Sequence, residues 1–399
     1  MRAMRFDHSD KVLGLQRRLD AFMREHVYPN EHTYHRQIAD GDRWAPTAIV
    51  EELKPVAKAA GLWNLFLPES EYGAGLTNVE YAPLCEIMGR VPGFGSEVFN
   101  CSAPDTGNME VLVRYGTDAQ RQQWLEPLLA GKIRSCFAMT EPDVASSDAT
   151  NIQSRIERVG DDYVVNGEKT SISAADQADA AVVFGRTGSI ESAAHGVTAL
   201  LVPMDLPGVT RNRFDCHGQR AIGRGSLFFE NVRVPVSHRL GDENKGFVQV
   251  MQGFDFSRAL IGLQVLAVAR VALEETWDYV AQREAFGKPL SAFQGVSHPL
   301  ADFDTQVEAA RLLCLQTLWL KDKGAPHTAE AAMCKWWAPK LSYDVIHQCL
   351  LMFGHGGYDR GPMEQRLRDV LGFQIGDGTA QIMKTIIART RAGREAVPA

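Results

Sequence analysis

Hydrophobic periodicity changes twice along the 399 residues of this chain, and this limits the folds that the chain can adopt. Up to about residue 135, apolar residues recur at helical spacing, as Val12, Leu15 and Leu19 do. Between about residues 150 and 240, short alternating runs such as 180–184 and 197–202 are separated by glycine and aspartate turns. Long helical patterns return after residue 246. We therefore expect an α+β chain with an N-terminal α-helical domain at 1–135, a middle antiparallel β-domain of barrel type at 136–245, and a C-terminal four-helix bundle at 246–399.

Several elements are predicted at defined positions. The Asn166-Gly167 pair lies between apolar or β-branched residues and predicts a β-hairpin turn. The Trp336-Trp337 pair is expected to fill the core of the bundle, because large aromatic side chains contribute most when they are buried. Apolar stripes and capping signals predict helices over residues 258–283, 299–322, 328–352 and 379–391.

Composition excludes several classes of function. The formal net charge of −7 argues against a general nucleic-acid binder or an anionic-membrane binder, because both need a basic surface. Seven scattered cysteines lack metal-ligand spacing, so neither a structural metal site nor a disulfide scaffold is expected. The first seven residues contain no apolar signal core, and polar residues interrupt the most apolar segment, 258–271. We expect a cytoplasmic protein with no membrane span.

One carboxylate stands out in the C-terminal region. Asp377 lies between Gly376 and Gly378, directly before a predicted helix that Thr379 can cap. Flanking glycines permit unusual backbone conformations and the close approach of a ligand. A plain turn before a helix is the commoner explanation of such a pattern, and composition alone favours it.

Three other segments contain groups that suit binding or catalysis. Residues 139–148 carry three hydroxyls among small residues and suit a loop around a phosphate or a planar ring, although turns use the same residue types. Residues 283–288 end a helix with basic groups, and residues 254–258 open the bundle; dipole compensation and helix capping would explain both. His355 is a possible general base, but histidines in loops are more often solvated. No nucleophile elbow, Walker loop or dinucleotide-binding glycine motif is present.

Taken in order, five motifs resemble those of the acyl-CoA dehydrogenase family, and the resemblance covers essentially the whole chain. The resemblance implies the helical, β, helical architecture of that family. The motifs are Met-Thr-Glu-Pro with Ser-Ser-Asp at 139–148, Asn-Gly-Glu-Lys at 166–169, Asn-Val-Arg-Val-Pro at 231–235, Arg-x-x-Phe-Gly-Lys-Pro at 283–289 and Asp-Gly-Thr-Ala-Gln-Ile at 377–382.

Two parts of the chain resemble different branches of this family. Residues 1 to about 165, including the segment 99–108, resemble the branch that handles 4-hydroxyacyl- or 4-phosphoacyl-CoA thioesters. Residues after about 168, including 169–173 and 331–337, resemble the cyclohexane- and cyclohexene-carboxyl-CoA dehydrogenases. The second part holds the expected base and most of the flavin site, so it carries more weight for the substrate.

The chemistry implied by the resemblance is the FAD-dependent α,β-dehydrogenation of an acyl-CoA thioester. A base removes the α-proton, and hydride passes from Cβ to flavin N5. The resemblance places the base at Asp377, where most members have glutamate, and the residue before it, usually aromatic, is Gly376. The thioester oxygen would accept hydrogen bonds from a ribityl hydroxyl and from the Asp377 backbone N–H. A shorter base and a missing ring widen the pocket, which favours an alicyclic acyl group.

The resemblance also assigns binding residues and implies a homo-oligomer, either a tetramer or a dimer. No metal is implied. The residues assigned to FAD are Phe137, Met139, Thr140, Ser146, Ser147, Ser173, Thr379 and Gln381, with Arg283, Phe286 and Gln294 reaching the FAD of a neighbouring subunit; those assigned to the substrate are Ser147, Phe254, Asp255, Arg258, Gly376 and Gly378.

Several alternatives stay open at the level of sequence. The acyl group could be branched or substituted at C4, and an oxidase of the same superfamily, such as one acting on nitroalkanes, also uses an aspartate base. A non-catalytic flavin- or CoA-binding protein is a further alternative. Ser171 replaces a tryptophan that covers the flavin in many members, which bears on the expected acceptor, an electron-transferring flavoprotein. Asp105 is either a helix-capping residue or a second acid for a 1,4-elimination.

Overall fold

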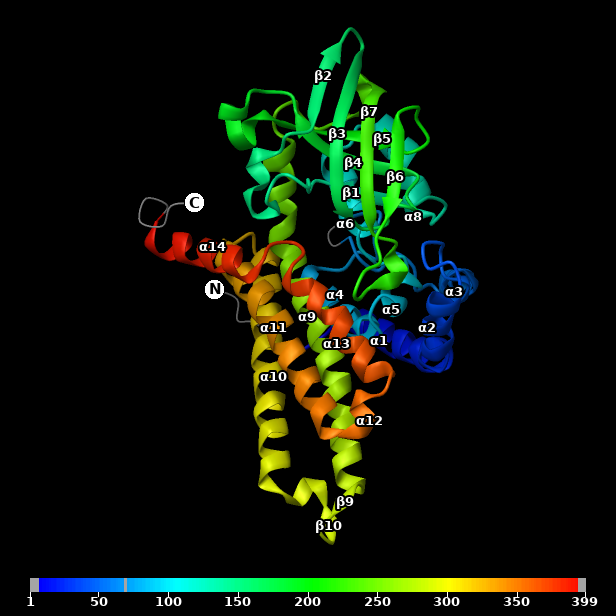
Figure 1. Cartoon of the computed structure of the whole chain (residues 1–399), viewed down its shortest axis with the longest axis vertical. Helices are drawn as coiled ribbons and strands as arrows, with labels where there is room; N and C mark the ends of the chain where they lie inside the picture. The colour runs from blue at the N-terminus through cyan, green and yellow to red at the C-terminus, as the bar shows by residue number, and fades with distance from the viewer. Residues whose placement is uncertain (1–6, 68–69, 394–399) are drawn as a thin grey trace.

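The structure is a computed structural model of the chain; it describes residues 7–67 and 70–393, without the side chains at 252–254 and 256. Figure 1 shows the sheet at one end of the molecule, a long helical bundle at the other, and the N-terminal helices beside the junction between them. This order of helical, β and helical parts confirms the fold class predicted from the sequence.

The N-terminal part consists of helices joined by short loops. Thr77 and Thr117 each begin a helix with a capping box, in which the threonine hydroxyl accepts from the backbone N–H three residues later and that residue's side chain accepts in return. The helices are α1 (Asp10–Phe22), α2 (Glu31–Asp40), α3 (Ala48–Ala59), α4 (Asn78–Gly89), α5 (Phe94–Glu97), α6 (Asp105–Tyr115), α7 (Asp118–Gln120) and α8 (Glu126–Leu129).

An eight-stranded sheet follows, with the strand order β6-β7-β3-β2-β4-β5-β8 and β1 paired with β4. Most pairs are antiparallel, but β1 and β2 each pair with β4 in parallel. In the described residues the two end strands of this order do not pair with each other, so the sheet is open. The strands are β1 (Ser135–Ala138), β2 (Arg155–Val159), β3 (Asp162–Ile172), β4 (Ala180–Arg186), β5 (Val197–Pro203), β6 (Val209–Arg213), β7 (Gly225–Pro235) and β8 (Arg239–Leu240).

The predicted hairpin turn at Asn166-Gly167 is wrong. Both residues lie inside β3, where the register with β7 shifts between Val165 and Gly167. The turn that joins β2 to β3 is formed instead by Gly160 and the residue after it. Gly167 has a φ of +145°, and a Cβ there would lie 2.4 Å from Ser154 Oγ, so this glycine serves a bulge and a close contact.

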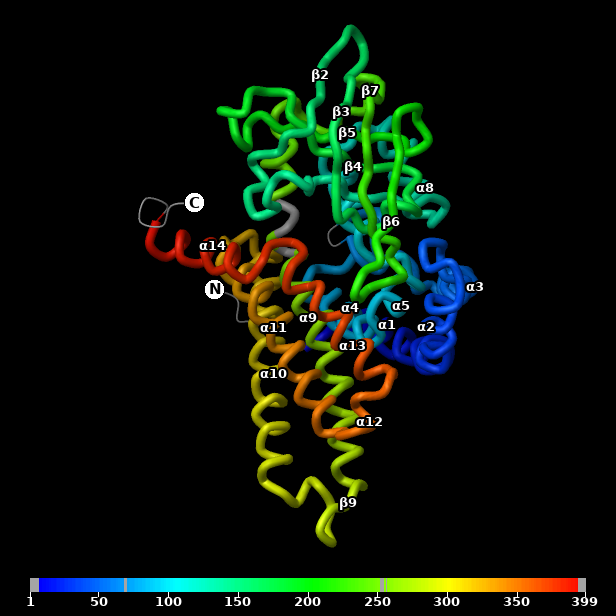
Figure 2. Tube along the Cα trace, viewed as in Figure 1, coloured from blue at the N-terminus to red at the C-terminus, as the bar shows by residue number. Residues whose placement is uncertain are grey.

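Long helices form the C-terminal bundle, as Figures 1 and 2 show. The prediction for 328–352 matches α11, but α9 begins at Gly246 rather than Arg258, and α10 begins at Gln294 with Pro299 inside it. The elements are α9 (Gly246–Gln282), β9 (Glu284–Ala285), β10 (Lys288–Pro289), α10 (Gln294–Asp322), α11 (Thr328–Met352), α12 (His355–Tyr358), α13 (Pro362–Leu371) and α14 (Ala380–Ala392).

Two hydrophobic clusters stabilise this arrangement. The larger runs from the N-terminal helices through one face of β4 and β5 into the bundle, and the smaller lies within the sheet. Alternate residues of β4 divide between them, since Val182 and Phe184 join the first cluster and Ala181 and Val183 the second. The Trp336-Trp337 pair was expected in the core, but both side chains are only half-buried.

Candidate active site

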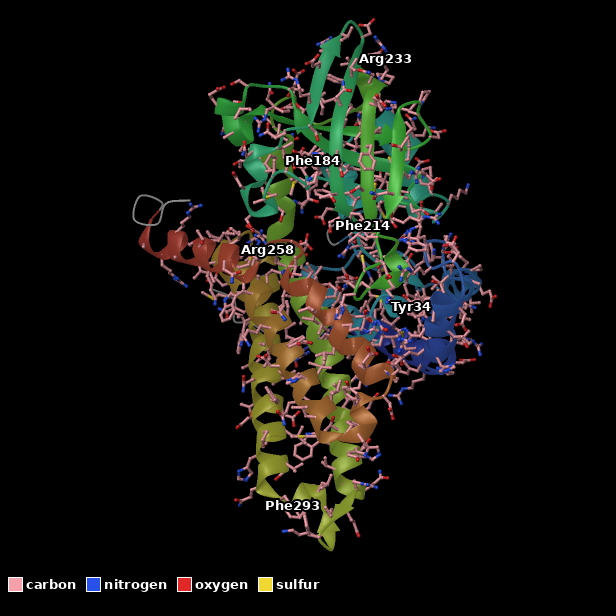
Figure 3. All side chains as sticks on the ribbon, viewed as in Figure 1. Tyr34, Phe184, Phe214, Arg233, Arg258 and Phe293 are labelled. Carbon is pink, nitrogen blue, oxygen red and sulfur yellow. The ribbon has the colours of Figure 1, made fainter. Side chains whose placement is uncertain are left out.

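A large cavity lies where the three parts of the chain meet. Its volume is about 1440 Å³, above the roughly 300–1,000 Å³ that one drug-sized ligand needs. Its wall takes residues from α2, α4, α6, β1, β3, α9 and α13, and from the loop before α14. Figure 3 places Arg258 at this junction, between the end of the sheet and the bundle. The cavity therefore has room for two ligands side by side.

Asp377 lies at the cavity wall, on the loop that precedes α14. Its φ is +57°, a left-handed conformation that aspartate and asparagine adopt more readily than most residues. Gly378 follows with a φ of +102°, and a Cβ there would lie 2.4 Å from Met383 Cε. A Cβ at Gly376 would meet only Gly372 O, at 3.8 Å. Gly378 is thus favoured by its backbone conformation, whereas Gly376 leaves open space beside the carboxylate.

Two cations interact electrostatically with this carboxylate. Lys335 on α11 is 1% exposed, and its Nζ donates to the carbonyl oxygens of Phe373 at 2.6 Å and Gly378 at 3.2 Å. Burial lowers the pKa of the Lys335 ammonium to about 8, against the opposing field of Asp377. Burial also lowers the pKa of Arg258, while Asp255 and Asp377 act against this shift. The carboxylate therefore faces the cavity in a positively charged setting.

Asp255 lies behind Arg258 and does not line the cavity. Its Oδ1 accepts from Arg258 Nη1 at 2.9 Å, and its Oδ2 accepts from the Thr328 hydroxyl at 2.6 Å. Asp255 therefore holds the guanidinium against the cavity wall and joins α9 to the start of α11. Phe254, the other substrate residue expected here, lies outside the described side chains.

The loop 139–148 is held by a buried ion pair. Lys169 is fully buried, and its Nζ lies 2.6 Å from Glu141 Oε1 and donates to Met139 O at 3.1 Å. Glu141 also accepts from the backbone N–H groups of Gln153 at 2.6 Å and Ser154 at 2.9 Å. Burial tends to raise the pKa of Glu141, but Lys169 and these N–H donors lower it overall. Burial lowers the pKa of Lys169 to about 8.

Most of the site residues predicted from the sequence meet at this cavity. Thr140 donates its hydroxyl hydrogen to Thr170 O, which fixes its orientation at the wall. Ser171, with a φ of +57°, is exposed beside it. The predicted residues that line the cavity are Phe137, Met139, Thr140, Ser146, Ser147, Ser173, Arg258, Gly376, Asp377, Gly378 and Thr379.

Other predicted residues lie away from the cavity wall. Arg283, Phe286 and Gln294 lie at the far tip of the bundle, where Figure 3 labels Phe293. Phe286 is 97% exposed and packs edge-on against Phe293. Gln381 is exposed on α14. Within this chain these four residues do not join the group at the cavity.

Asp105 does not line the cavity either. Its Oδ1 accepts from the backbone N–H of Ser135 at 2.6 Å and from the Ser135 hydroxyl at 2.7 Å, and its Oδ2 accepts from Arg134 Nε at 3.2 Å. This buried carboxylate joins the start of α6 to β1, so we assign it a structural role rather than that of a second acid. His355 also lies outside the cavity wall, exposed at the start of α12.

Sequence reasoning missed Lys335, Glu141 and Lys169 as functional candidates. Glu141 and Lys169 were considered only as parts of family motifs. Glu141 follows Met-Thr, and Lys169 lies in a predicted β-strand region, so these two opposite charges could have suggested a buried ion pair. Lys335 is the single charge in the apolar run 331–338, which was the available signal. A charged residue in a buried helix needs a partner, and here the partner is the loop of Asp377.

The cavity fits a dinucleotide cofactor as well as a second ligand. The hydroxyls of Thr140, Ser146, Ser147 and Ser173 offer donors and acceptors along its wall. Arg224 Nε is buried at the wall and makes no hydrogen bond within the described residues, and a buried guanidinium donor of this kind fits an electronegative ligand atom. No group of three or more His, Cys, Asp or Glu side chains in the described ranges is placed to hold a metal ion.

This arrangement is typical of a class of protein: a cofactor-dependent enzyme whose cavity is large enough for cofactor and substrate and has a carboxylate, Asp377, on a glycine-flanked loop at its wall. Family profiles agree, since the acyl-CoA dehydrogenase N-terminal, middle and C-terminal domains match residues 9–132, 136–232 and 244–391. The chain belongs to the acyl-CoA dehydrogenase family, which places it among the FAD-dependent oxidoreductases.

Known proteins resemble the chain over nearly its full length. Probable acyl-CoA dehydrogenase FadE2 of Mycobacterium tuberculosis is 40% identical over 98% of this chain and 98% of its own. Acyl-CoA dehydrogenase family member 10 of Mus musculus is 41% identical over 96% of the chain, which spans 37% of that protein. The butyryl-CoA dehydrogenase structure from Megasphaera elsdenii superposes with a TM-score of 0.85 at 28% identity, covering 97% of this chain and 100% of that one.

Across the described residues, none of the helices combines the length and apolar character needed to cross a lipid bilayer.

Proposed function

We propose that the chain oxidises an alicyclic acyl-CoA thioester, of the cyclohexane- or cyclohexene-carboxyl type, at its α,β bond. The observation that carries this proposal is the loop 376–378, which presents Asp377 to the cavity with no side chain at Gly376. A ring-bearing acyl group needs width next to the base, and a Cβ at Gly376 would have free space around it. The shorter base leaves further room between the backbone and the α-carbon.

In the proposed reaction, the Asp377 carboxylate takes the α-proton of the thioester. FAD, when bound, supplies the hydride acceptor for the hydrogen at Cβ. The backbone N–H of Asp377 would donate to the thioester oxygen as negative charge develops there, and Arg258, held by Asp255, would orient the acyl-CoA. Gly378 and Ser147 would line the path of the acyl-CoA.

For FAD, we propose the cavity-lining residues of β1 and of the loop 139–148, together with two residues further along the chain: Phe137, Met139, Thr140, Ser146, Ser147, Ser173 and Thr379. The position of Arg283, Phe286 and Gln294 at the tip of the bundle supports their proposed contact with the FAD of a neighbouring subunit, and hence a homotetramer or homodimer. Gln381, exposed on α14, would meet the adenosine side. We further propose an electron-transferring flavoprotein as acceptor, a cytoplasmic location, and domain boundaries near 135 and 245.

The direct test is anaerobic mixing of the purified flavoprotein with single thioesters while the visible absorbance of the flavin is followed. Cyclohexanecarboxyl-CoA or cyclohex-1-enecarboxyl-CoA is expected to bleach the flavin at least about 10-fold faster than hexanoyl-CoA, because pocket fit discriminates by roughly 1–3 kcal/mol. Faster bleaching by hexanoyl-CoA would contradict the alicyclic assignment and leave the reaction class intact.

A second candidate substrate is an acyl-CoA with a polar substituent at C4. Gln264 lines the cavity on an otherwise apolar part of the wall near Tyr81, Cys85 and Leu260, and its side chain hydrogen-bonds to the Cys85 thiol. It lies six residues beyond Arg258 on α9, which is about 9 Å along the helix. A hydroxyl on the acyl chain could meet this amide. Faster bleaching by 4-hydroxyvaleryl-CoA than by either ring thioester would favour this candidate.

Gly376→Tyr is expected to fold normally and to lose activity mainly with ring thioesters. The added side chain has room at its Cβ, so the free energy of unfolding should change by less than about 0.5 kcal/mol. The phenol ring would occupy the space next to Asp377, and bleaching by a ring thioester should slow by about 10- to 100-fold. The rate of flavin bleaching by hexanoyl-CoA should fall much less.

The matched control is Gly14→Tyr, which adds the same side chain on α1 at a position with nothing within 4 Å and away from the cavity. It should leave both rates unchanged. An equal loss with ring and straight-chain thioesters in Gly376→Tyr would show that Gly376 does not set the width of the acyl pocket.

A further inference from the structure

Lys335 is bound to both ends of the loop that carries Asp377. Its two hydrogen-bond acceptors are the carbonyl oxygens of Phe373, before Asp377, and Gly378, directly after it. The amine comes from α11, a separate and rigid element of the bundle. It therefore joins the loop to the scaffold at two points and spans the residue that faces the cavity.

The loop has little else to fix it. The backbone N–H groups of Ile375 and Gly376 both donate to Gly372 O, at 3.1 Å each, and the Thr379 hydroxyl caps α14. Asp377 and Gly378 both have left-handed backbone conformations. A non-glycine residue such as Asp377 keeps this sparsely populated conformation only when surrounding contacts restrain the backbone. The two bonds from Lys335 supply such a restraint next to the carboxylate.

A buried ammonium is costly, so its presence on an apolar helix face needs an explanation. Within the bundle Lys335 is as buried as its neighbours Cys334 and Ala338. The charged groups whose fields act on it are Asp377 on the loop, which favours its protonated form, and Arg258 on α9, which opposes it. An apolar side chain at this position would be favoured if only packing were required.

We propose that Lys335 is a positioning residue for the catalytic base: it fixes the loop 373–378 through two carbonyl groups and so holds the Asp377 carboxylate in place at the cavity wall. This inference rests on the proposed role of Asp377 in the reaction. Lys335 touches neither the substrate nor the reacting atoms in this scheme, and it transfers no proton. It acts through the position of Asp377.

The expected consequence is a loss in the chemical step rather than in binding. A displacement of roughly 1 Å at a reacting group can cost about 100-fold in rate. Lys335→Met keeps an unbranched side chain but removes the donor and the charge, so bleaching at saturating thioester should slow by about 10- to 100-fold. The thioester KM and the affinity for an acyl-CoA thioether, which lacks the carbonyl and cannot be oxidised, should change by less than about 2-fold, since Arg258 and Asp255 are intact.

Rescue by a conservative variant separates this role from a merely structural one. Lys335→Arg keeps a cation and N–H donors at this position and should restore part of the rate at saturating thioester that Lys335→Met loses. The thioester KM should stay within about 2-fold of the parent value in both variants. If Lys335→Met does not fold, Lys335→Gln, whose amide nitrogen ends one atom short of the lysine Nζ, carries the same comparison.

Ser342→Ala is the matched control on the same helix. The Ser342 hydroxyl is fully buried and donates to Val265 O at 2.7 Å, away from the loop. This variant should lower the melting temperature without changing the rate at saturating thioester. If Lys335→Met behaves as Ser342→Ala does, with a rate at saturating thioester within about 2-fold of the parent rate, the positioning role is overturned.

A parallel measurement on Asp377→Asn tests the role of Asp377 separately from the role of Lys335. If Asp377→Asn still bleaches with substrate, the role of Asp377 fails and this inference fails with it. If Asp377→Asn is inactive while Lys335→Met matches the parent enzyme, the proposed function stands and only the role of Lys335 is overturned.

Discussion

Replacing Asp377 by asparagine is expected to slow substrate-dependent bleaching of the flavin by at least about 1,000-fold, within the range of general-base catalysis. The amide cannot accept the α-proton, while its size and shape are nearly those of the carboxylate. Asparagine tolerates the left-handed backbone at this position well. Folding and FAD content should therefore match the parent protein, and anaerobic stopped-flow absorbance would measure the loss.

Asp302→Asn, an identical chemical change on the exposed surface of α10, is the control and should leave the bleaching rate unchanged. A rate for Asp377→Asn within about 10-fold of the parent rate would remove Asp377 as the base. The other carboxylates near the cavity, beginning with Glu110, would then need the same substitution.

Glu141→Gln is expected to lower the free energy of unfolding by about 3–5 kcal/mol, which is the usual cost of removing one partner of a buried ion pair. The amide replaces one acceptor oxygen by an NH2 group. In one orientation that group would face the Lys169 ammonium and the Ser154 N–H, and in the other it would face the Gln153 N–H. The loop 139–148 should loosen as a result, so FAD should also dissociate more readily.

Thermal and urea unfolding with and without added FAD would measure both effects. Glu157→Gln is the control, because Glu157 forms an exposed ion pair with Arg155 at 2.9 Å, and exposed pairs contribute about 0–1 kcal/mol. If Glu141→Gln is no less stable than this control, the buried pair does not hold the loop.

The architecture could be predicted from periodicity because each part buries one face of its elements. The helix over 328–352 was found at both ends, since its apolar stripe and its terminal signals agree. The start of α9 was placed too late. Asp255 and Ser257 look like capping residues, but in the structure the segment before Arg258 is part of α9. Packing of α9 between the sheet and the bundle outweighs this local signal.

In the β-region, too, local sequence signals did not suffice to place the elements. Gly160 and Asn166-Gly167 both give turn signals, and the sequence cannot say which of them reverses the chain. The pairing of β3 with both β2 and β7 decides, because only a turn at Gly160 leaves β3 long enough to pair on both edges. Pro299 was likewise expected to begin its helix, but the structure continues the helix back to Gln294.

Some residues of the candidate site could be predicted from the sequence, and others could not. Asp377, its two glycines and the hydroxyl-rich loop were found from sequence, because a carboxylate between glycines and a run of small polar residues are local patterns. Lys335 and the Glu141–Lys169 pair were not found, because their partners are distant along the chain. Asp105 could be judged only when its oxygens were seen to be bonded to Ser135 and Arg134.

By itself, the sequence determined the order of helical, β and helical parts, the family resemblance, and the residue expected to act as base. Periodicity and short motifs are local properties of the chain, so they can be recognised without knowledge of the fold. Only the tertiary structure decided that Lys335 spans the loop of Asp377, that Asp255 supports Arg258 from behind, and that Gly376, unlike Gly378, leaves open space. Each of these contacts joins atoms from elements that are distant along the chain, so only the packing of the whole fold brings the atoms together.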